Sequence, residues 1–572
     1  MPSRDSSTAL ADAKLDFTPA VLDPAHIGDI EGALGTVRLG DHGPRRSTRR
    51  RLLTFLAIMG PGLIVMVGDN DAGGVQTYTQ AGQAYGYSLL WVLALLLPVL
   101  VISQEMVARL GAVTGVGHAR LIRERFGRTW AAFAVFDLFI LNFLTLLTEF
   151  VGVYFGFAYF GIPKLASVTA AGVALFAIAA SGKFRWWERF MFALISASLV
   201  FIPAALMAHP RWTSIGYHSL VPGVAGGVSG QAILLIVALV GTTVAPWQLF
   251  FQQSNIIDKR ISPRWLNYKR LDTIVGGFLT TIAAGAMIVF GAALFHSHRF
   301  GSPALYTDSG WFNHAISATL GPVAGALAAV MLIVASLVGA AAVSLSSSYA
   351  FGDSFGSRNS LHRGIRSAPQ FYAAYAAQIF LACLVVAVAS NAFLGTATQY
   401  VQILAGILLP SAVLFLLLLC NDPEVLGPWV NGTATNIVTS LIVGVLVVLS
   451  ADLTIATLFP HIDGVALTEA CFGVAAAATA PASALLLVAK HRKALPTSLD
   501  RVGASKATGA ARPEASREVR NAERAVWRMP ELNQLRPPTP SLARRASLLV
   551  LRCYLIASLL VVGFRAFSPY LR

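Results

Sequence analysis

Two interruptions in otherwise apolar stretches constrain the fold of this chain most strongly. The first is the run Gly68 to Gly74 (GDNDAGG), and the second is the run Gly241 to Gln248 (GTTVAPWQ). Each lies near the middle of a hydrophobic segment that is long enough to cross a membrane. Non-helical backbone at that depth is tolerated only inside a helix bundle or beside a water-filled cavity. Paired broken helices in the two halves of a chain are the best sequence indication of a transporter's substrate site.

The composition indicates an integral membrane protein. Hydrophobic residues make up 55% of the chain and charged residues 12%, whereas soluble domains carry about 25% charged residues. We therefore predict an all-α membrane protein with about 12 spans, because uncharged runs of about 20 residues recur along the chain. The expected spans are 52–80, 86–111, 130–160, 166–182, 188–208, 229–257, 271–297, 318–350, 369–391, 397–420, 434–459 and 466–489.

The net charge of +15 is distributed in a way that predicts topology. Lys and Arg gather in alternate short loops, beginning with Arg45 to Arg51 before the first span and Arg120 to Arg128 after the second. This positive-inside pattern predicts a cytoplasmic N-terminus and a multi-pass protein of the plasma membrane, here a bacterial inner membrane. The basic residues are expected to contact anionic lipid, not nucleic acid. The 4 cysteines lie in apolar runs and predict neither disulfides nor a zinc site.

The spans divide the chain into five regions. Five plus five spans, with the first of each set broken, are the arrangement of an inverted repeat. The predicted regions are a disordered cytoplasmic tail (1–50), an inverted-repeat transport core (51–425), additional transmembrane helices (426–490), a basic cytoplasmic linker (491–545) and an apolar C-terminal segment that is a possible extra span (546–572).

Carboxylates at mid-membrane depth are the first candidate metal ligands, because burying them unpaired costs several kcal/mol. Asp71 is followed by Gly73 and Gly74, which free backbone carbonyls beside the acid, and a carboxylate with carbonyl oxygens suits a hard cation. The alternative is that Asp71 only caps a half-helix. Asp69 either lines the entry to the site or caps a helix. Glu149 in the third span either neutralises cation charge or accepts a structural hydrogen bond.

The second interruption offers neutral oxygens. Pro246 forbids a regular helix there, so the carbonyls of Val244 and Ala245 are candidate metal ligands. Gln248 either binds a cation or its water through the amide oxygen, or hydrogen-bonds to the unwound backbone. Asn70, Trp247 and Gln252 are expected to line the cavity.

Several motifs in order resemble those of the NRAMP family of divalent-metal transporters. They are Gly60-Pro61-Gly62 followed by GDNDAGG, Leu110 to Gly115 (LGAVTG), Arg123 to Gly127 (RERFG), Thr148-Glu149-Phe150, Phe184 to Glu188 (FRWWE) and Val244 to Phe250 (VAPWQLF). The resemblance covers about residues 52–425. It implies a LeuT-type fold and import of a divalent cation.

The chain departs from the family pattern at the implied metal site. The family's metal-binding Asp aligns with Asp71, but its Asn partner is Gly74 here, and its Met-Pro-His-Asn is Ala245 to Gln248 (APWQ). The family's second sixth-span His aligns with Gln252, and a third-span Asp with Leu146. These changes resemble the magnesium transporters related to NRAMP.

The departures predict a different ion preference. Loss of a thioether removes the preference for soft transition metals, and a wider oxygen-lined site suits Mg²⁺, which keeps several waters when bound. Loss of the titratable groups weakens proton coupling. We predict a non-enzymatic importer of Mg²⁺, and of Mn²⁺, that works by alternating access without proton coupling. The metal is its substrate, and no cofactor or protein partner is expected.

Two alternatives remain open from the sequence. The first is a proton-coupled Mn²⁺/Fe²⁺ importer of the NRAMP type with a remodelled site. The second is a sodium-coupled amino-acid symporter of the same fold, in which Asp71 would repel the carboxylate of the substrate.

Overall fold

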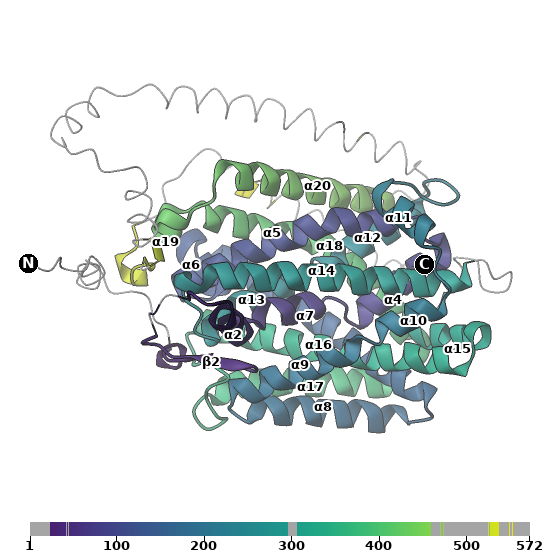
Figure 1. The fold of residues 1–572 in the computed structure, drawn as a ribbon, viewed down its shortest axis with the longest axis horizontal. Helices are drawn as coiled ribbons and strands as arrows, with labels where there is room; N and C mark the ends of the chain where they lie inside the picture. The colour runs from purple at the N-terminus through teal and green to yellow at the C-terminus, as the bar shows by residue number, and fades with distance from the viewer. Residues whose placement is uncertain are drawn as a thin grey trace, which may run out of the picture.

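The structure is a computed structural model of the chain. It describes residues 23–41, 43, 45–295 and 306–458, and further along the chain residues 470, 473, 524–525, 527–536, 548–549 and 552. Nearly all described elements are helices, and most of the long ones run along the long axis of the molecule (Figure 1). The described strands are β1 (Ile30–Gly32) and β2 (Gly35–Val37), which pair antiparallel.

The long helices follow the expected order in two halves. The first half contains α3 (Pro61–Val67), α4 (Ala72–Tyr85), α5 (Leu90–Thr114), α7 (Arg128–Tyr159), α8 (Lys164–Ala180), α9 (Phe184–Ser198) and α10 (Phe201–Met207). The second half contains α12 (Gly230–Thr243), α13 (Pro246–Asp258), α14 (Leu266–Gly291), α16 (Pro322–Phe355), α17 (Pro369–Val388) and α18 (Asn391–Cys420).

Shorter helices connect or follow these spans. They are α2 (Thr48–Ile58), α6 (His118–Phe126), α11 (Trp212–Leu220), α15 (Ser309–Leu320), α19 (Pro423–Leu426), α20 (Thr433–Leu458) and the 3₁₀ turns η1 (Pro24–His26), η2 (Pro263–Trp265), η3 (Ala292–Leu294), η5 (Gly427–Trp429) and η7 (Leu532–Gln534).

The described helices include 8 that are long and apolar enough to cross a membrane, or 9 if the bent pair α2 and α3 forms one span. The helices α8 and the first part of α20 are apolar but shorter. The expected span at 466–489 lies outside the described residues, as do residues 1–22, most of 491–545 and most of 546–572.

Corresponding helices of the two halves pack against each other. Helix α7 packs along α16, and α5 packs along α14. Small residues permit this close approach: a Cβ on Gly152 of α7 would lie 2.6 Å from the Cβ of Ala72 and 2.2 Å from Oγ of Ser336. Small residues at helix contacts are typical of membrane bundles. The two interrupted spans therefore sit in the centre of the bundle, where α4 contacts α7, α12, α14, α16 and α18.

The first predicted span is bent near its start. Helix α2 is bent by 55° from α3, and the bend lies at Met59-Gly60-Pro61, where Gly60 has φ 151° and Pro61 opens α3. A positive φ of this kind favours glycine, and Pro is suited to the first turn of a helix. The start of the span at residue 52 stays a prediction: α2 carries exposed arginines, and α2 and α3 together are apolar enough to form one bent span.

The prediction that residues 1–50 form a disordered tail is wrong for residues 23–41. They form η1 and the β1–β2 hairpin. Ile30 and Val37 are buried, and a Cβ on Gly35 would lie 3.2 Å from the Cβ of Ala57 in α2. The local sequence is polar, and its order comes from contacts with distant helices, which no local pattern reveals.

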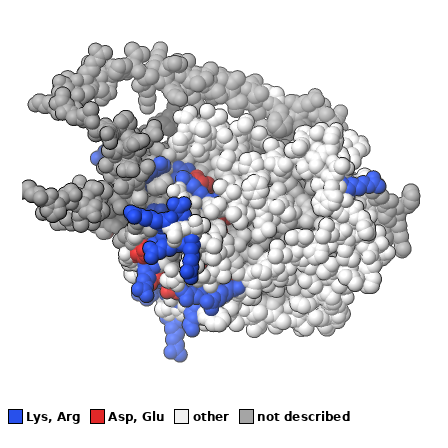
Figure 2. Space-filling model, viewed as in Figure 1, with Lys and Arg blue, Asp and Glu red and all other residues white. Residues whose placement is uncertain are grey.

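Basic side chains gather at one end of the molecule. Figure 2 shows Lys and Arg concentrated at the end where β2, α2 and α6 lie in Figure 1, with an almost uncharged surface elsewhere on this face. We call this the basic end. It includes Arg49 to Arg51 on α2 and Arg120 and Arg123 on α6. It also includes Arg185, Arg260 and Arg363, which bond to Thr36, Ala25 and Asp23 of the N-terminal segment.

Part of the predicted linker 491–545 also docks at this end. The backbone N–H of Met529 donates to the carbonyl of Val113 at 3.2 Å, and the Met529 side chain is fully buried. The indole N–H of Trp429 donates to the carbonyl of Arg524 at 2.8 Å. This stretch is therefore part of the folded core, which its basic composition did not indicate.

Candidate metal-binding site

Both helix breaks occur where the sequence predicts them. Helix α3 ends at Val67 and α4 begins at Ala72, with Asp71 in an extended conformation as its N-cap. Helix α12 ends at Thr243 and α13 begins at Pro246, with Val244 and Ala245 between them. The prediction of broken first and sixth helices is confirmed.

The two interruptions lie side by side. A Cβ on Gly74 would lie 2.9 Å from the carbonyl oxygen of Asp69 and 3.3 Å from Oγ1 of Thr242. The amide Nε2 of Gln248 donates a hydrogen bond to Oδ1 of Asp69, which links the first break to the start of α13. All of these groups are buried. Oxygens from both interruptions therefore converge in the centre of the bundle.

Asp71 and Glu149 bring two carboxylates together. Oδ1 of Asp71 accepts from the N–H of Gly74 at 2.7 Å, and Oε2 of Glu149 accepts from the N–H of Ala72 at 3.1 Å. Both side chains border Gly339 of α16, where a Cβ would lie 2.6 Å from Cδ of Glu149 and 2.8 Å from Cβ of Asp71. Two carboxylates in contact repel each other unless a cation or a proton lies between them.

Asp71 therefore does cap a half-helix, as one interpretation of the sequence expected. The cap uses one carboxylate oxygen, Oδ1. Glu149 also accepts a structural hydrogen bond. For Glu149 the structural role and the role of a metal ligand are compatible, because its Oε1 has no hydrogen-bond partner among the described residues.

Several buried polar atoms at this place lack a hydrogen-bond partner within the part of the chain that the structure describes. They are Oδ2 of Asp69, Oε1 of Glu149, Oγ1 of Thr242 and Nε2 of Gln402. Buried polar atoms are almost always satisfied by protein, water or an ion. Most of these atoms are oxygens, so they suit a hard divalent cation or the waters that surround it.

The three predicted cavity-lining residues support the broken segments. Nδ2 of Asn70 donates to the carbonyl of Thr280 on α14 at 3.2 Å. Nε2 of Gln252 donates to the carbonyl of Gln104 on α5 at 3.1 Å. The ring of Trp247 lies so close to Gly68 that a Cβ there would be 3.3 Å from it. All three are buried, and their role in lining an open cavity stays a prediction.

Gln248 is held on both sides. Its Nε2 donates to Asp69, and its Oε1 accepts from Nε2 of Gln104 at 3.1 Å. The amide therefore positions Asp69 in this conformation, which is a different role from either one expected from the sequence. A metal-ligand role for Gln248 would require the oxygen to leave Gln104.

Sequence reasoning missed Gln402 of α18. A Cβ on Gly73 would lie 1.7 Å from Nε2 of Gln402, so the amide sits directly against the first interruption, and only glycine leaves room for it. The sequence feature that could have identified Gln402 is its amide within a long apolar span. Polar groups at that depth of a membrane usually serve a function. Thr242 and Gly339 were missed as well, because only the packing of α12 and α16 brings them to the site.

The site is built from oxygen and amide donors. Among the described residues, no group of three or more His, Cys, Asp or Glu side chains lies close enough to hold a metal ion. The carboxylates of Asp71 and Glu149 are instead accompanied by hydroxyl, amide and backbone groups. A set of this kind lacks the soft ligands that select transition metals.

Two helices broken at the centre of a helical bundle, each opposite the other and beside buried carboxylates, define a membrane protein of the LeuT-type fold. The family model described as "Natural resistance-associated macrophage protein-like" matches residues 62–456. The chain belongs to this family, NRAMP.

Curated relatives and a solved structure agree with this assignment. A "Divalent metal cation transporter MntH" of Ralstonia nicotianae is 30% identical over 68% of this chain and 88% of its own length. The same-named protein of Burkholderia ambifaria is 28% identical over 69% of this chain and 89% of its own. A crystal structure of the Eremococcus coleocola manganese transporter superposes with a TM-score of 0.60 at 19% identity, over 76% of this chain and 97% of that chain. This likeness supports the shared fold.

Proposed function

We propose that the protein is a divalent cation transporter that moves Mg²⁺, and also Mn²⁺, by alternating access without proton coupling. Relatives over most of their length carry the name divalent metal cation transporter, which supports the class of substrate. The choice of Mg²⁺ and the absence of coupling rest on the residues at the two interruptions.

The chemistry of the second interruption carries the proposal. Ala245 aligns with the Met of the family pattern. It is the N-cap residue of α13, and its methyl side chain makes no capping hydrogen bond. The polar groups nearby in the two interruptions are the carboxylates of Asp71 and Glu149, which border Gly339, and the hydroxyl of Thr242, which borders Gly74. Mg²⁺ binds oxygen ligands and keeps several of its waters, so an oxygen-lined site with small side chains accommodates it without full dehydration.

The groups along α13 do not favour a proton relay. Gln252 stands at one position where the family has His, and its amide is fixed on α5. His118 of α6 lies beside α13, 2.8 Å from Oε1 of Gln253, with its ring 4.7 Å from that of Phe250. Burial lowers the pKa of His118 to about 4, although its hydrogen bond to Gln253 opposes this shift. The imidazole therefore stays neutral at physiological pH and does not exchange a proton there.

We also propose that the basic end faces the cytoplasm of a bacterial cell. The excess of Lys and Arg at this end is the pattern that places a loop inside. The ion would then enter at the opposite end, where α11 and α15 lie in Figure 1, and leave at the basic end.

A second candidate is a proton-coupled manganese importer. The curated relatives named divalent metal cation transporter MntH favour it. The two candidates differ in proton coupling and in ion preference. The proton-coupled importer requires that the lumen acidify as the ion enters, and that the site prefer Mn²⁺ or Cd²⁺ to Mg²⁺.

Ion and proton fluxes in proteoliposomes test the proposal. We expect entry of Mg²⁺ and Mn²⁺ down their gradients, with no acidification of the lumen and no change in rate when a pH gradient is imposed. The matched pair of variants is Asp71→Asn at the site and Asp308→Asn at the N-cap of α15. Asp308 makes the same kind of cap, accepting from the N–H of Trp311 at 2.8 Å. Absence of Mg²⁺ entry, or stoichiometric acidification, contradicts the proposal.

A further inference from the structure

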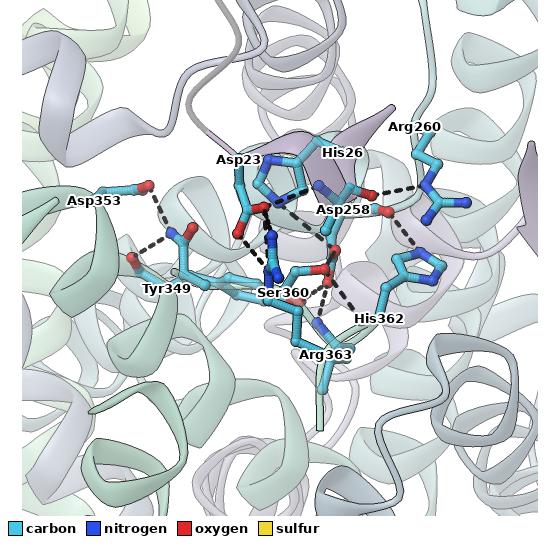
Figure 3. Close-up of polar contacts among 12 residues, drawn as sticks. Asp23, His26, Asp258, Arg260, Tyr349, Asp353, Ser360, His362 and Arg363 are labelled. Carbon is cyan, nitrogen blue, oxygen red and sulfur yellow. Dashed lines mark hydrogen bonds and ion pairs between the residues drawn. The ribbon is translucent and has the colours of Figure 1, made fainter. Parts of the chain in front are cut away.

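The N-terminal segment crosses the basic end and binds elements from both halves of the core. We call residues 23–37, which comprise η1 and the β1–β2 hairpin, the N-terminal clasp. Figure 3 shows its first part, where Asp23 and His26 meet Asp258, Arg260 and Arg363. Asp258 ends α13, and Arg363 lies in the connection between α16 and α17.

The first contact of the clasp joins Asp23 to Arg363. Nε of Arg363 donates to Oδ2 of Asp23 at 2.9 Å, and Nη2 donates to Oδ1 (Figure 3). Asp23 is only 2% exposed. A two-point pair between guanidinium and carboxylate is the strong, directional form of an ion pair. It ties the start of the described chain to the loop that follows α16.

The end of α13 is a second contact. Nε of Arg260 donates to the carbonyl of Ala25 at 2.9 Å, and the imidazole of His26 lies 3.7 Å from Oδ1 of Asp258. Asp258 also accepts from the hydroxyl of Ser360 at 2.5 Å. The clasp, the end of α13 and the 358–366 connection therefore share one polar cluster around Asp258 (Figure 3).

The hairpin makes a third contact, which extends to the start of α3. The N–H of Ala33 donates to Oε2 of Glu188 on α9 at 2.5 Å. Oε1 of Glu188 accepts from Nζ of Lys259 at 2.5 Å, and the same ammonium donates to the carbonyl of Met59 at 2.7 Å. Met59 immediately precedes the bend before α3. Glu188 and Lys259 are fully buried, so breaking this chain of contacts would leave unpaired charges.

These contacts hold together elements that transport must separate. In alternating access one bundle rocks against the other, around a central site formed by discontinuous helices. An opening at the basic end requires α3 and α13 to part from α9 and from the connection after α16. The clasp joins α13, α9 and that connection, and it reaches the residue that precedes α3.

We propose that the N-terminal clasp is an intramolecular lock that holds the basic end closed, and that it must detach before the ion can leave there. This inference rests on the proposed alternating access, but not on the identity of the ion. A clasp that only anchors the chain during folding would make the same contacts without affecting how often the basic end opens.

Thiol labelling of the full chain separates these two roles. Ser254 lines a small pocket at the basic end together with His26 and Asp353, and it is buried. The background for this test is a chain whose 4 native cysteines are replaced by alanine and whose uptake of Mn²⁺ is checked first. Ser254→Cys is then introduced into this background. The rate at which this cysteine reacts with a water-soluble maleimide in detergent reports how often the basic end opens. No ion is needed, so the result does not depend on whether Mg²⁺ is the cargo.

We expect Asp23→Asn to raise the labelling rate about two- to fivefold, since the loss of one ion pair shifts a two-state equilibrium by that much. Asn keeps the side-chain oxygen that accepts from Ala25. The charge-swapped pair Asp23→Lys with Arg363→Asp should restore slow labelling. The matched control is Asp41→Asn, which breaks an ion pair to Arg45 inside the N-terminal region and should leave the rate unchanged. Equal rates in Asp23→Asn and in the unmodified background overturn the lock.

Cross-linking gives an independent test. With Asp23→Cys and Arg363→Cys, a short, reducible bifunctional thiosulfonate should stop Mn²⁺ uptake in proteoliposomes, and a reductant should restore it. Each single variant treated with the same reagent is the control and should keep its uptake. Uptake that continues while the two positions are covalently joined overturns the proposal, whatever the labelling shows. If neither variant nor background takes up any ion while labelling still responds to Asp23→Asn, the proposed function fails and the lock stands.

Discussion

The two interruptions are built by different chemistry, although they occupy equivalent places in the two halves. The first is charged: it carries Asp69 and Asp71 and is flanked by glycines. The second is neutral: Val244 and Ala245 precede Pro246, and no carboxylate lies within it. One break therefore supplies negative charge, and the other supplies backbone and hydroxyl oxygens. The two halves therefore share the position of the break but not its residue chemistry.

The largest effect is expected from removing charge at the first break. Asp71→Ala should lower Mg²⁺ uptake at least about 100-fold, because a buried site loses both a ligand and the countercharge of a divalent ion. The measurement is initial uptake in proteoliposomes at matched protein density. Asp308→Ala removes an N-cap of the same geometry at α15 and should retain near-normal uptake. Wild-type flux in Asp71→Ala would remove this residue from the site.

The space between the carboxylates is the next most sensitive feature. Gly339→Val should lower uptake about tenfold or more, since even a Cβ there would lie 2.6 Å from Cδ of Glu149 and overpacking costs about 1–3 kcal/mol. Gly285→Val on α14 is the control, because its nearest neighbour would be Leu90 at 3.8 Å. Similar losses in both variants would indicate a general effect of valine on the helices.

Giving the second break a soft ligand should change selectivity. Ala245→Met should shift the preference toward Mn²⁺ or Cd²⁺ over Mg²⁺ by about tenfold, because a thioether favours soft ions and narrows the site. Competitive uptake of Mg²⁺ against Cd²⁺ measures the shift. Ala286→Met on the partly exposed surface of α14 controls for side-chain size. Unchanged selectivity would place Ala245 away from the ion path.

The smallest effect is expected at the amide that touches the first break from α18. Gln402→Ala should raise the KM for Mg²⁺ about two- to fivefold with little change in maximal rate. Its Nε2 has no hydrogen-bond partner among the described residues, so it is available to bond a water at the site, and one neutral hydrogen bond is worth about 1 kcal/mol. Gln378→Ala on α17 is the control, because Gln378 donates within its own helix, to Ala374 at 2.9 Å. If Gln402→Ala does not change the KM, the amide serves only in packing.

Local chemistry makes the interruptions predictable. Pro246 cannot continue a helix, and the glycines around Asp71 mark unwinding, so the sequence alone locates both breaks. The positions of the long helices follow from the apolar runs. Whether Asp71 or Ala245 binds an ion stays a prediction, since the structure fixes their neighbours but not their ligand.

Features that depend on distant packing could not be predicted. Gln402 reaches Gly73 only because α18 packs on α4. The order of the N-terminal clasp comes from Glu188, Arg260 and Arg363, which lie far away in the sequence. The start of α3 depends on Gly60, whose φ of 151° is a conformation that the residue permits but does not require.

The pairing of Asp23 with Arg363 has a consequence for how the protein is made. The two residues are separated by 340 positions, which a ribosome adds in about 20 to 70 seconds at ordinary rates of synthesis. During that interval Asp23 lacks its arginine partner, while successive helices enter the bilayer. Closure of this contact therefore follows the synthesis of α16, and it can precede the synthesis of α17 and α18.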